Sequence, residues 1–258
     1  MHTTFIGIDP TAGQRPITYA ALDADLRLLA LGQGDMNEVL AFVGGQRQAF
    51  VAISAPQRPN KGLMAKSEVR EGLSPKPRPG RYTNCRLAEY LLRQQGIQVY
   101  LTPAKAETCP TWKRLSFKLY KRLEDLGYRL YPQDESALQY MEVYPHGCFV
   151  VLLGRRPFHK HTLEGRLQRQ LILHEAGLDI SDPLRFFEEI TRYRLLQGIL
   201  PLEWLHTPEE LDALAAAYTA WLASTKPDEV ILLGDPQEGQ VVLPVAQPGK
   251  SQSSPGAE

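Results

Sequence analysis

Apolar residues in the first fifth of the chain form short runs that predict strands, with one helical pattern between them. The runs at residues 5–8, 17–22, 26–31 and 50–53 are typical of buried strands, and residues 35–43 have apolar positions on one helical face. The link between the second and third runs is short and polar, which favours a hairpin. We therefore expect three antiparallel strands, and then a helical crossover to a fourth strand.

The rest of the chain alternates further helical and extended patterns. Helical periodicity is found at residues 84–95, 111–126, 162–176, 184–199 and 207–224. Further strands are expected at 97–101, 230–233 and 241–243, and residues 141–145 are typical of a strand end or an edge strand. We therefore expect a single α/β domain over residues 1–245, with an inserted basic loop at about 57–82 and a disordered tail at 246–258.

Composition changes this picture little. Of the 258 residues, 43% are hydrophobic and 22% are charged, and the formal net charge is zero, as in a globular domain with a full core. No segment has the length of apolar sequence that a membrane span requires, and the chain enters its first strand without a leader pattern, so we expect a cytoplasmic protein without a membrane partner. Its three cysteines lack CxxC spacing, which argues against a disulfide framework and a zinc site.

Charge is nevertheless uneven along the chain. Between residues 57 and 122 there are fifteen Lys and Arg and four Glu, which leaves a local charge of +11. Such a block suits the phosphate backbone of a nucleic acid, although a basic run can also be a solvated surface. The candidate contacts in this block are Arg58, Lys61, Lys76, Arg78, Arg81 and Arg86, and Lys160 and Arg166 could add a second set.

Three acids have positions that call for an explanation. Asp9 ends the first strand, where a carboxylate must be solvated, paired or bound to a cation, although Asp is also a common turn residue. Asp212 lies on the flank of the apolar stripe of the last helix, with Glu209 one turn earlier on the same side. The helix dipole by itself explains Glu209, and it explains Asp212 less well.

Several short motifs, taken in order, resemble a known family. The antiparallel start, the acid at the end of the first strand and the Ala-rich last helix are similar to the ribonuclease H-like fold, and that helix is similar to the one in RuvC-type resolvases. The whole set resembles DUF429, an uncharacterised family described as predicted nucleases of that fold, over roughly residues 3–224. The motifs are Gly7-Ile-Asp9, Ala52-Ile-Ser54-Ala-Pro56, Asn84-Cys-Arg86, Glu142-Val-Tyr-Pro145, Gly165-Arg166 with Leu171, and Leu211-Asp212-Ala213.

The resemblance implies an α/β protein with a ribonuclease H-like mixed sheet and a two-metal phosphodiesterase activity. Carried over by position, Asp9, Glu142 and Asp212 would be catalytic metal ligands, with Glu209 as a fourth, and the cofactors would be two Mg²⁺ or Mn²⁺ ions. One position departs from the family pattern, because Ser54 stands where an Asp is usual. A hydroxyl is a weaker ligand than a carboxylate and adds no charge.

Two functions of different class therefore remain open. One is a metal-dependent nuclease acting on DNA or RNA, for which the acids and the basic loop must meet in one groove. The other is a nucleic-acid-binding or adaptor protein that keeps the fold and lacks a complete metal site. A kinase or ATPase of the related actin-like superfold is a more distant alternative, because that architecture needs a duplicated fold with two Gly-rich phosphate loops.

Overall fold

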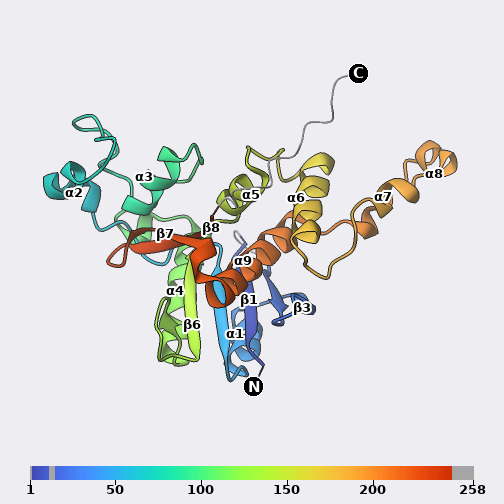
Figure 1. Cartoon of the computed structure of the whole chain (residues 1–258), viewed down its shortest axis with the longest axis horizontal. Helices are drawn as coiled ribbons and strands as arrows, with labels where there is room; N and C mark the ends of the chain where they lie inside the picture. Colours follow the sequence, from blue (N-terminus) through green and yellow to red (C-terminus); the bar gives the residue numbers. More distant parts are fainter. Residues whose placement is uncertain (1, 12–14, 246–258) are drawn as a thin grey trace.

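A mixed sheet of eight strands forms the centre of the computed structural model, which describes residues 2–11 and 15–245 (Figure 1). The strand order is β3-β2-β1-β4-β6-β8-β7, and the short β5 pairs with β6. The strands are β1 (Thr4–Asp9), β2 (Ile17–Leu22), β3 (Leu28–Gly34), β4 (Ala49–Ile53), β5 (Arg129–Leu130), β6 (Leu138–Val143), β7 (Val230–Asp235) and β8 (Gly239–Pro244).

Strand directions follow the expected mixture. β2 is antiparallel to both β1 and β3, whereas β4 is parallel to β1, β6 to β4, and β8 to β6. Helix α1 (Met36–Gly44) provides the crossover from β3 to β4. β7 and β8 form the antiparallel closing hairpin. The predicted α/β class with a mixed sheet is therefore confirmed.

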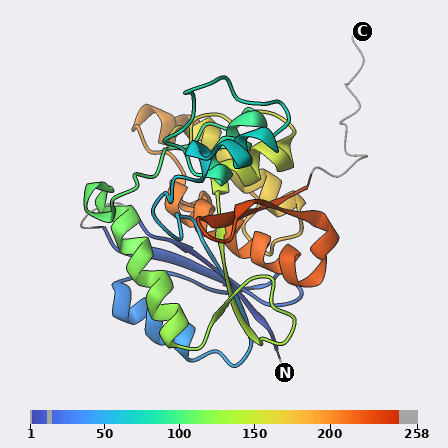
Figure 2. The ribbon, with the colours of Figure 1, turned by 90° about the vertical axis from the view of Figure 1, so that its left-hand side faces the viewer.

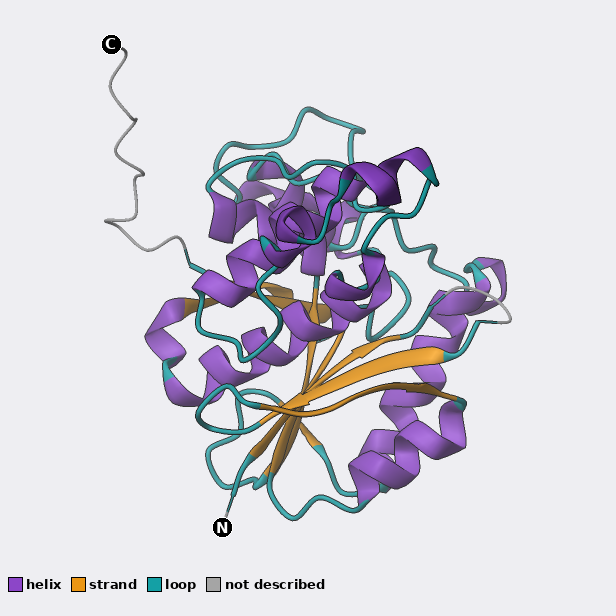
Figure 3. Cartoon of the chain, turned by 90° about the vertical axis from the view of Figure 1, so that its right-hand side faces the viewer, coloured by secondary structure: helices purple, strands orange, loops and turns teal. Residues whose placement is uncertain are grey.

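Helices cover both faces of the sheet (Figures 2 and 3). Because successive side chains point to opposite faces, Ile6, Ile8 and Ile53 pack toward α1 and α4 (Thr111–Asp125). On the other face, α9 (Pro208–Thr225) lies across β1, and α5 (Pro145–Leu153) and α6 (Leu163–Glu175) pack against α9. Each face therefore carries its own apolar layer.

α9 approaches β1 unusually closely because β1 has a glycine at the contact. A Cβ atom at Gly7 would lie 1.9 Å from the Ala213 carbonyl oxygen and 2.4 Å from the Ala217 nitrogen. The facing turns of α9 are built from alanine, which allows the two backbones to touch. This contact fixes where the N-terminal turns of α9 lie relative to the end of β1.

A long insertion separates β4 from β5. It contains a 3₁₀ turn (Leu63–Ala65), α2 (Ser67–Glu71), α3 (Leu87–Gln94), a second 3₁₀ turn (Ala106–Thr108) and α4. Its α3 packs against β7. The predicted basic loop at 57–82 is the first part of this insertion.

Two expectations for local structure were wrong, and a third was right in part. Residues 97–101 form no strand, because their carbonyl groups accept hydrogen bonds from side chains. The Lys113 ammonium, for example, donates to the carbonyls of Tyr100 and Leu101. The helix expected at 184–199 is two short helices, α7 (Arg185–Glu188) and α8 (Arg192–Leu196), which project from the body (Figure 1). Residues 141–143 do end a strand, β6, as one of the two alternatives expected, but β6 is an interior strand and not an edge strand, and Pro145 begins α5.

Two further 3₁₀ turns, Leu202–Trp204 and Pro227–Glu229, flank α9. Within the described residues, no helix combines the length and the apolar character needed to cross a lipid bilayer. The tail expected at 246–258 lies outside the described residues.

Candidate functional site

Asp9 lies at the carboxyl end of β1, beside the end of the parallel strand β4. The Ser54 hydroxyl donates a hydrogen bond to Asp9 Oδ1, and the Ser54 backbone N–H donates to the Ile8 carbonyl at 2.9 Å. Since Gly7 faces α9, the alternation along β1 places Asp9 on the same face. Thr18 is its direct partner on β2 and therefore shares that face.

The first turns of α9 bring two more acids to this point. A capping box between Thr207 and Glu210, with Pro208 at the first position, sets the start of the helix. Asp212 lies one turn further on and is only 8% exposed. Its Oδ2 accepts a hydrogen bond of 2.6 Å from the Lys160 ammonium, which comes from the loop between α5 and α6. Glu209 is half-buried.

We call Asp9, Ser54, Lys160, Glu209 and Asp212 the Asp9–Asp212 cluster. Its electrostatics are those of crowded acids. Burial, and then the charge of Asp212, raise the pKa of Asp9 from 3.8 to about 7, although the Ser54 hydroxyl opposes the shift. Burial lowers the pKa of Lys160, but Asp212, with Asp9 and Glu209, outweighs burial and raises it above its ordinary value. The cluster therefore favours an additional positive charge.

This raised pKa predicts a pH dependence of stability. Because the folded chain binds the Asp9 proton more tightly than the unfolded chain, the contribution of Asp9 is fully present below about pH 4. It is lost as the pH rises toward about 7. We therefore expect Asp9→Asn, which cannot ionise, to become progressively more stable than the natural chain between pH 4 and pH 8 without divalent ions.

Urea unfolding at several pH values measures this difference. Asp125→Asn, at an exposed acid of α4, is the control and should follow the natural chain. A gap between Asp9→Asn and the natural chain that stays constant over this pH range would contradict the assignment.

Glu142 does not join the cluster. Met141 and Val143 pack on the α9 face, so the intervening Glu142 points to the α4 face, away from Asp9. There the Arg86 guanidinium binds both of its carboxylate oxygens, and the Gln57 backbone N–H donates to it at 2.8 Å. The expectation that Glu142 and Asp9 converge was therefore wrong, because their side chains lie on opposite faces of the sheet.

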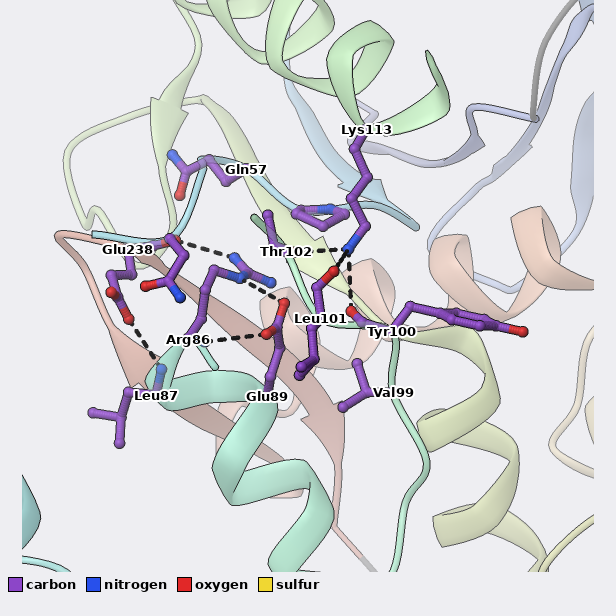
Figure 4. A network of polar contacts seen from close by, with 12 residues as sticks. Gln57, Arg86, Leu87, Glu89, Val99, Tyr100, Leu101, Thr102, Lys113 and Glu238 are labelled. Atoms are coloured by element: carbon purple, nitrogen blue, oxygen red, sulfur yellow. Dashed lines mark hydrogen bonds and ion pairs between the residues drawn. The ribbon is translucent and has the colours of Figure 1, made fainter. Parts of the chain in front are cut away.

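Arg86 is also not a surface contact. It is 2% exposed, and its Nε donates to Glu89 at 3.2 Å (Figure 4). Burial opposes its charge, but Glu142 and Glu89 outweigh burial and raise its pKa further. The expectation of a phosphate contact at Arg86 was therefore wrong, because its donors are already bound to acids inside the protein.

The same interior network contains two groups that sequence reasoning missed. The carboxylate of Glu238 accepts backbone N–H groups of Lys61, Leu63 and Leu87 at 2.8–3.0 Å. Lys113 is 1% exposed, and its ammonium donates to three oxygen atoms, including Thr102 Oγ1 at 2.8 Å (Figure 4). Burial lowers the pKa of Lys113 to about 8. Part of the basic block therefore belongs to the interior of the insertion.

The other predicted contacts for nucleic acid divide into engaged and exposed side chains. Arg166 donates to the carbonyls of His206 at 2.8 Å and Leu205 at 2.6 Å, and Arg58 lies 4.0 Å from Glu124. Lys160 binds Asp212. The remaining four are exposed on the insertion, and in the described part of the chain no hydrogen bond or ion pair joins them to the Asp9–Asp212 cluster: Lys61, Lys76, Arg78 and Arg81.

The donor chemistry of the cluster suits one hard cation. As the side chains lie, no three His, Cys, Asp or Glu residues among the described positions could together hold a metal ion. Mg²⁺, however, is commonly held by one or two carboxylates and completed by water and substrate phosphate oxygens. Asp9 and Asp212 provide such a pair. The Thr18 hydroxyl, buried beside Asp9, has no hydrogen-bond partner among the described residues and is one more oxygen at this point.

Comparison with known proteins yields one match. No curated protein and no solved structure matches the chain significantly. The family model described as "Protein of unknown function (DUF429)" matches residues 7–238, a stretch that includes Asp9, Lys160, Asp212 and the insertion. The chain therefore belongs to the DUF429 family.

Proposed function

We propose that this protein is a divalent-metal-dependent nuclease that hydrolyses phosphodiester bonds of nucleic acid. The observation that carries the proposal is the meeting of Asp9 and Asp212 at the carboxyl end of β1, where burial and the charge of Asp212 raise the pKa of Asp9. Such an excess of negative charge is relieved by a cation, and oxygen donors select Mg²⁺ or Mn²⁺.

The fold gives a second line of support. Three antiparallel strands, a crossover helix, a parallel fourth strand and a late Ala-rich helix packed on β1 are the arrangement expected of a ribonuclease H-like nuclease. In this chain the close contact at Gly7 places Asp212 beside Asp9. The candidate site thus depends on backbone packing rather than on a mobile loop.

Four residues of the cluster take part in this proposal. A bound divalent ion would activate water and stabilise the leaving oxygen. Asp9 and Asp212 would hold it, and the Ser54 hydroxyl fixes the orientation of the Asp9 carboxylate. Lys160 offsets part of the charge of Asp212. The exposed bases Lys61, Lys76, Arg78 and Arg81 would bind the phosphate backbone.

A cleavage assay tests the proposal. Branched, single-stranded and hybrid nucleic acids are incubated with Mn²⁺ and the natural chain, Asp9→Asn or Asp212→Asn. We expect each Asn variant to lose several kcal/mol of transition-state stabilisation, on the order of 10²–10³-fold in rate. Asp125→Asn should cleave like the natural chain. Equal cleavage by the natural chain and both cluster variants would refute the proposed site.

A second function is favoured by two specific observations. Ser54 contributes no charge, and Glu142 lies on the other face of the sheet, so a carboxylate-rich two-ion site is not assembled. A nucleic-acid-binding protein without catalysis would keep the exposed bases and dispense with the metal. Salt-sensitive binding of an oligonucleotide, with no cleavage of any member of the panel, would support this second function.

A further inference from the structure

We infer that the Asp9–Asp212 cluster takes a single divalent ion and that the Lys160 ammonium supplies the positive charge that a second ion would otherwise bring. The inference rests on the proposed metal-dependent function and concerns how that site is built. It assigns Lys160 to the site itself, rather than to a peripheral phosphate contact.

The acids available are too few for two ions. A pair of divalent ions brings four positive charges, and paired ions are held by shared carboxylates. The face that carries Asp9 offers Asp212 and Glu209 in addition, because the Ser54 hydroxyl is neutral and Glu142 points to the opposite face. Glu209 also has a partner, since Arg15 lies 3.5 Å from its Oε1.

Lys160 already occupies this acidic surface as a cation. Its Nζ lies 2.6 Å from Asp212 Oδ2, a short charge-assisted hydrogen bond, and the charges of Asp9 and Glu209 act on it as well. Three ionised carboxylates and the Lys160 ammonium leave two negative charges, and Arg15, beside Glu209, lowers this to one if it is counted as well. One divalent ion is therefore enough to balance the charge of the cluster, and a second would leave a large positive excess.

The backbone around Lys160 is held in place, and the side chain, which is 37% exposed, is bound at its end to Asp212. Arg169 is 2% exposed and donates to the Phe158 carbonyl at 2.8 Å and to the Gly165 carbonyl at 3.0 Å. A Cβ atom at Gly165 would lie 1.9 Å from the His159 carbonyl oxygen, so glycine allows the loop to lie directly on α6. These contacts hold the main chain on both sides of Lys160, so that its ammonium reaches Asp212 on α9.

A buried hydroxyl on the face of Asp9 lacks a hydrogen-bond partner among the described residues. Thr18 is fully buried, is the cross-strand partner of Asp9, and its hydroxyl has no hydrogen-bond partner among the described residues. Lys160 approaches Asp212 instead. We therefore expect the Thr18 hydroxyl to be a further oxygen donor, directly or through water, to an ion held by Asp9 and Asp212.

Mn²⁺ binding without nucleic acid tests the inference. Calorimetry should give one Mn²⁺ per natural chain, and electron paramagnetic resonance should show an isolated ion without exchange coupling. Lys160→Gln removes the positive charge, so we expect either a second Mn²⁺ with a coupled spectrum or affinity for the first ion tighter on the order of tenfold. Lys160→Arg should keep one ion, and Lys118→Gln, at an exposed lysine of α4, should match the natural chain.

Two results would overturn the inference: two coupled ions in the natural chain, or Lys160→Gln with unchanged stoichiometry and affinity. These outcomes are separate from the fate of the proposed function. One bound ion without cleavage of any nucleic acid would reject the nuclease and keep the single-ion site. Cleavage with two coupled ions would keep the nuclease and reject the role of Lys160.

Discussion

Arg86→Met is expected to destabilise the protein by about 3–5 kcal/mol, because it leaves two buried carboxylates without their positive partner. Arg86, Glu89 and Glu142 are each at most 3% exposed, and the guanidinium binds both acids. Urea unfolding of the natural chain and the variant measures the loss. Arg81→Met, at an exposed arginine of the same insertion, should change the free energy of unfolding by about 0.5 kcal/mol or less.

A triple variant distinguishes the stability lost through unpaired charge from the stability lost through poorer packing. Arg86→Met combined with Glu89→Gln and Glu142→Gln removes the stranded charges, and both Gln side chains still accept the backbone N–H bonds from residues 86 and 57. We expect this variant to recover a large part of the stability lost by Arg86→Met. If the free energy of unfolding of Arg86→Met lies within about 1 kcal/mol of that of the natural chain, the network is not the buried ion cluster described above.

Gly7→Ala is expected to cost about 3 kcal/mol or more, at the upper end of overpacking effects. The added methyl would meet backbone atoms of α9 rather than flexible side-chain ends, so α9 must move away from β1. That movement separates Asp212 from Asp9. Mn²⁺ affinity measured by calorimetry should therefore fall together with the unfolding free energy.

The matched control for Gly7→Ala is Gly44→Ala at the end of α1. There a Cβ atom would meet only two methyl groups of Leu126, at 3.5 and 3.7 Å, which is ordinary contact. We expect its stability and its Mn²⁺ affinity to match or exceed those of the natural chain. Normal Mn²⁺ affinity in a folded Gly7→Ala protein would show that the close approach of α9 is not what assembles the cluster.

Local sequence was a good guide wherever an element buries a simple apolar face. The strand at Thr4–Asp9 and the helices at Thr111–Asp125 and Pro208–Thr225 were expected within a few residues, because alternation or helical periodicity follows directly from which side chains are buried. Residues 97–101 have the same apolar character as a strand. Their carbonyls are bound by side chains from distant positions, which no local pattern encodes.

The candidate site was predictable in part. Asp9 at a strand end and Asp212 on the edge of a buried helix face could be found from position alone. Alternation places Glu142 on the face opposite Met141, but both faces of the sheet are apolar, so only the strand register, which aligns Glu142 with Ile53 and Ile8, separates it from Asp9. The burial of Arg86 and the direction of the Lys160 side chain could not be predicted from neighbouring residues in the sequence, since each depends on a partner 50 or more positions away.

Glu238 has a consequence for how the insertion would move. Its carboxylate binds the main chain at residues 61, 63 and 87 to the β7–β8 turn. The stretch at 72–81 lies between these points and is largely exposed, and carbonyls within it are bound by the side chains of Arg70 and Tyr90. Any opening of the insertion would begin in that exposed segment and stop at the anchored ends. A protease added to the native protein should accordingly nick the 72–81 segment first, leaving two fragments that stay associated until denaturant releases them.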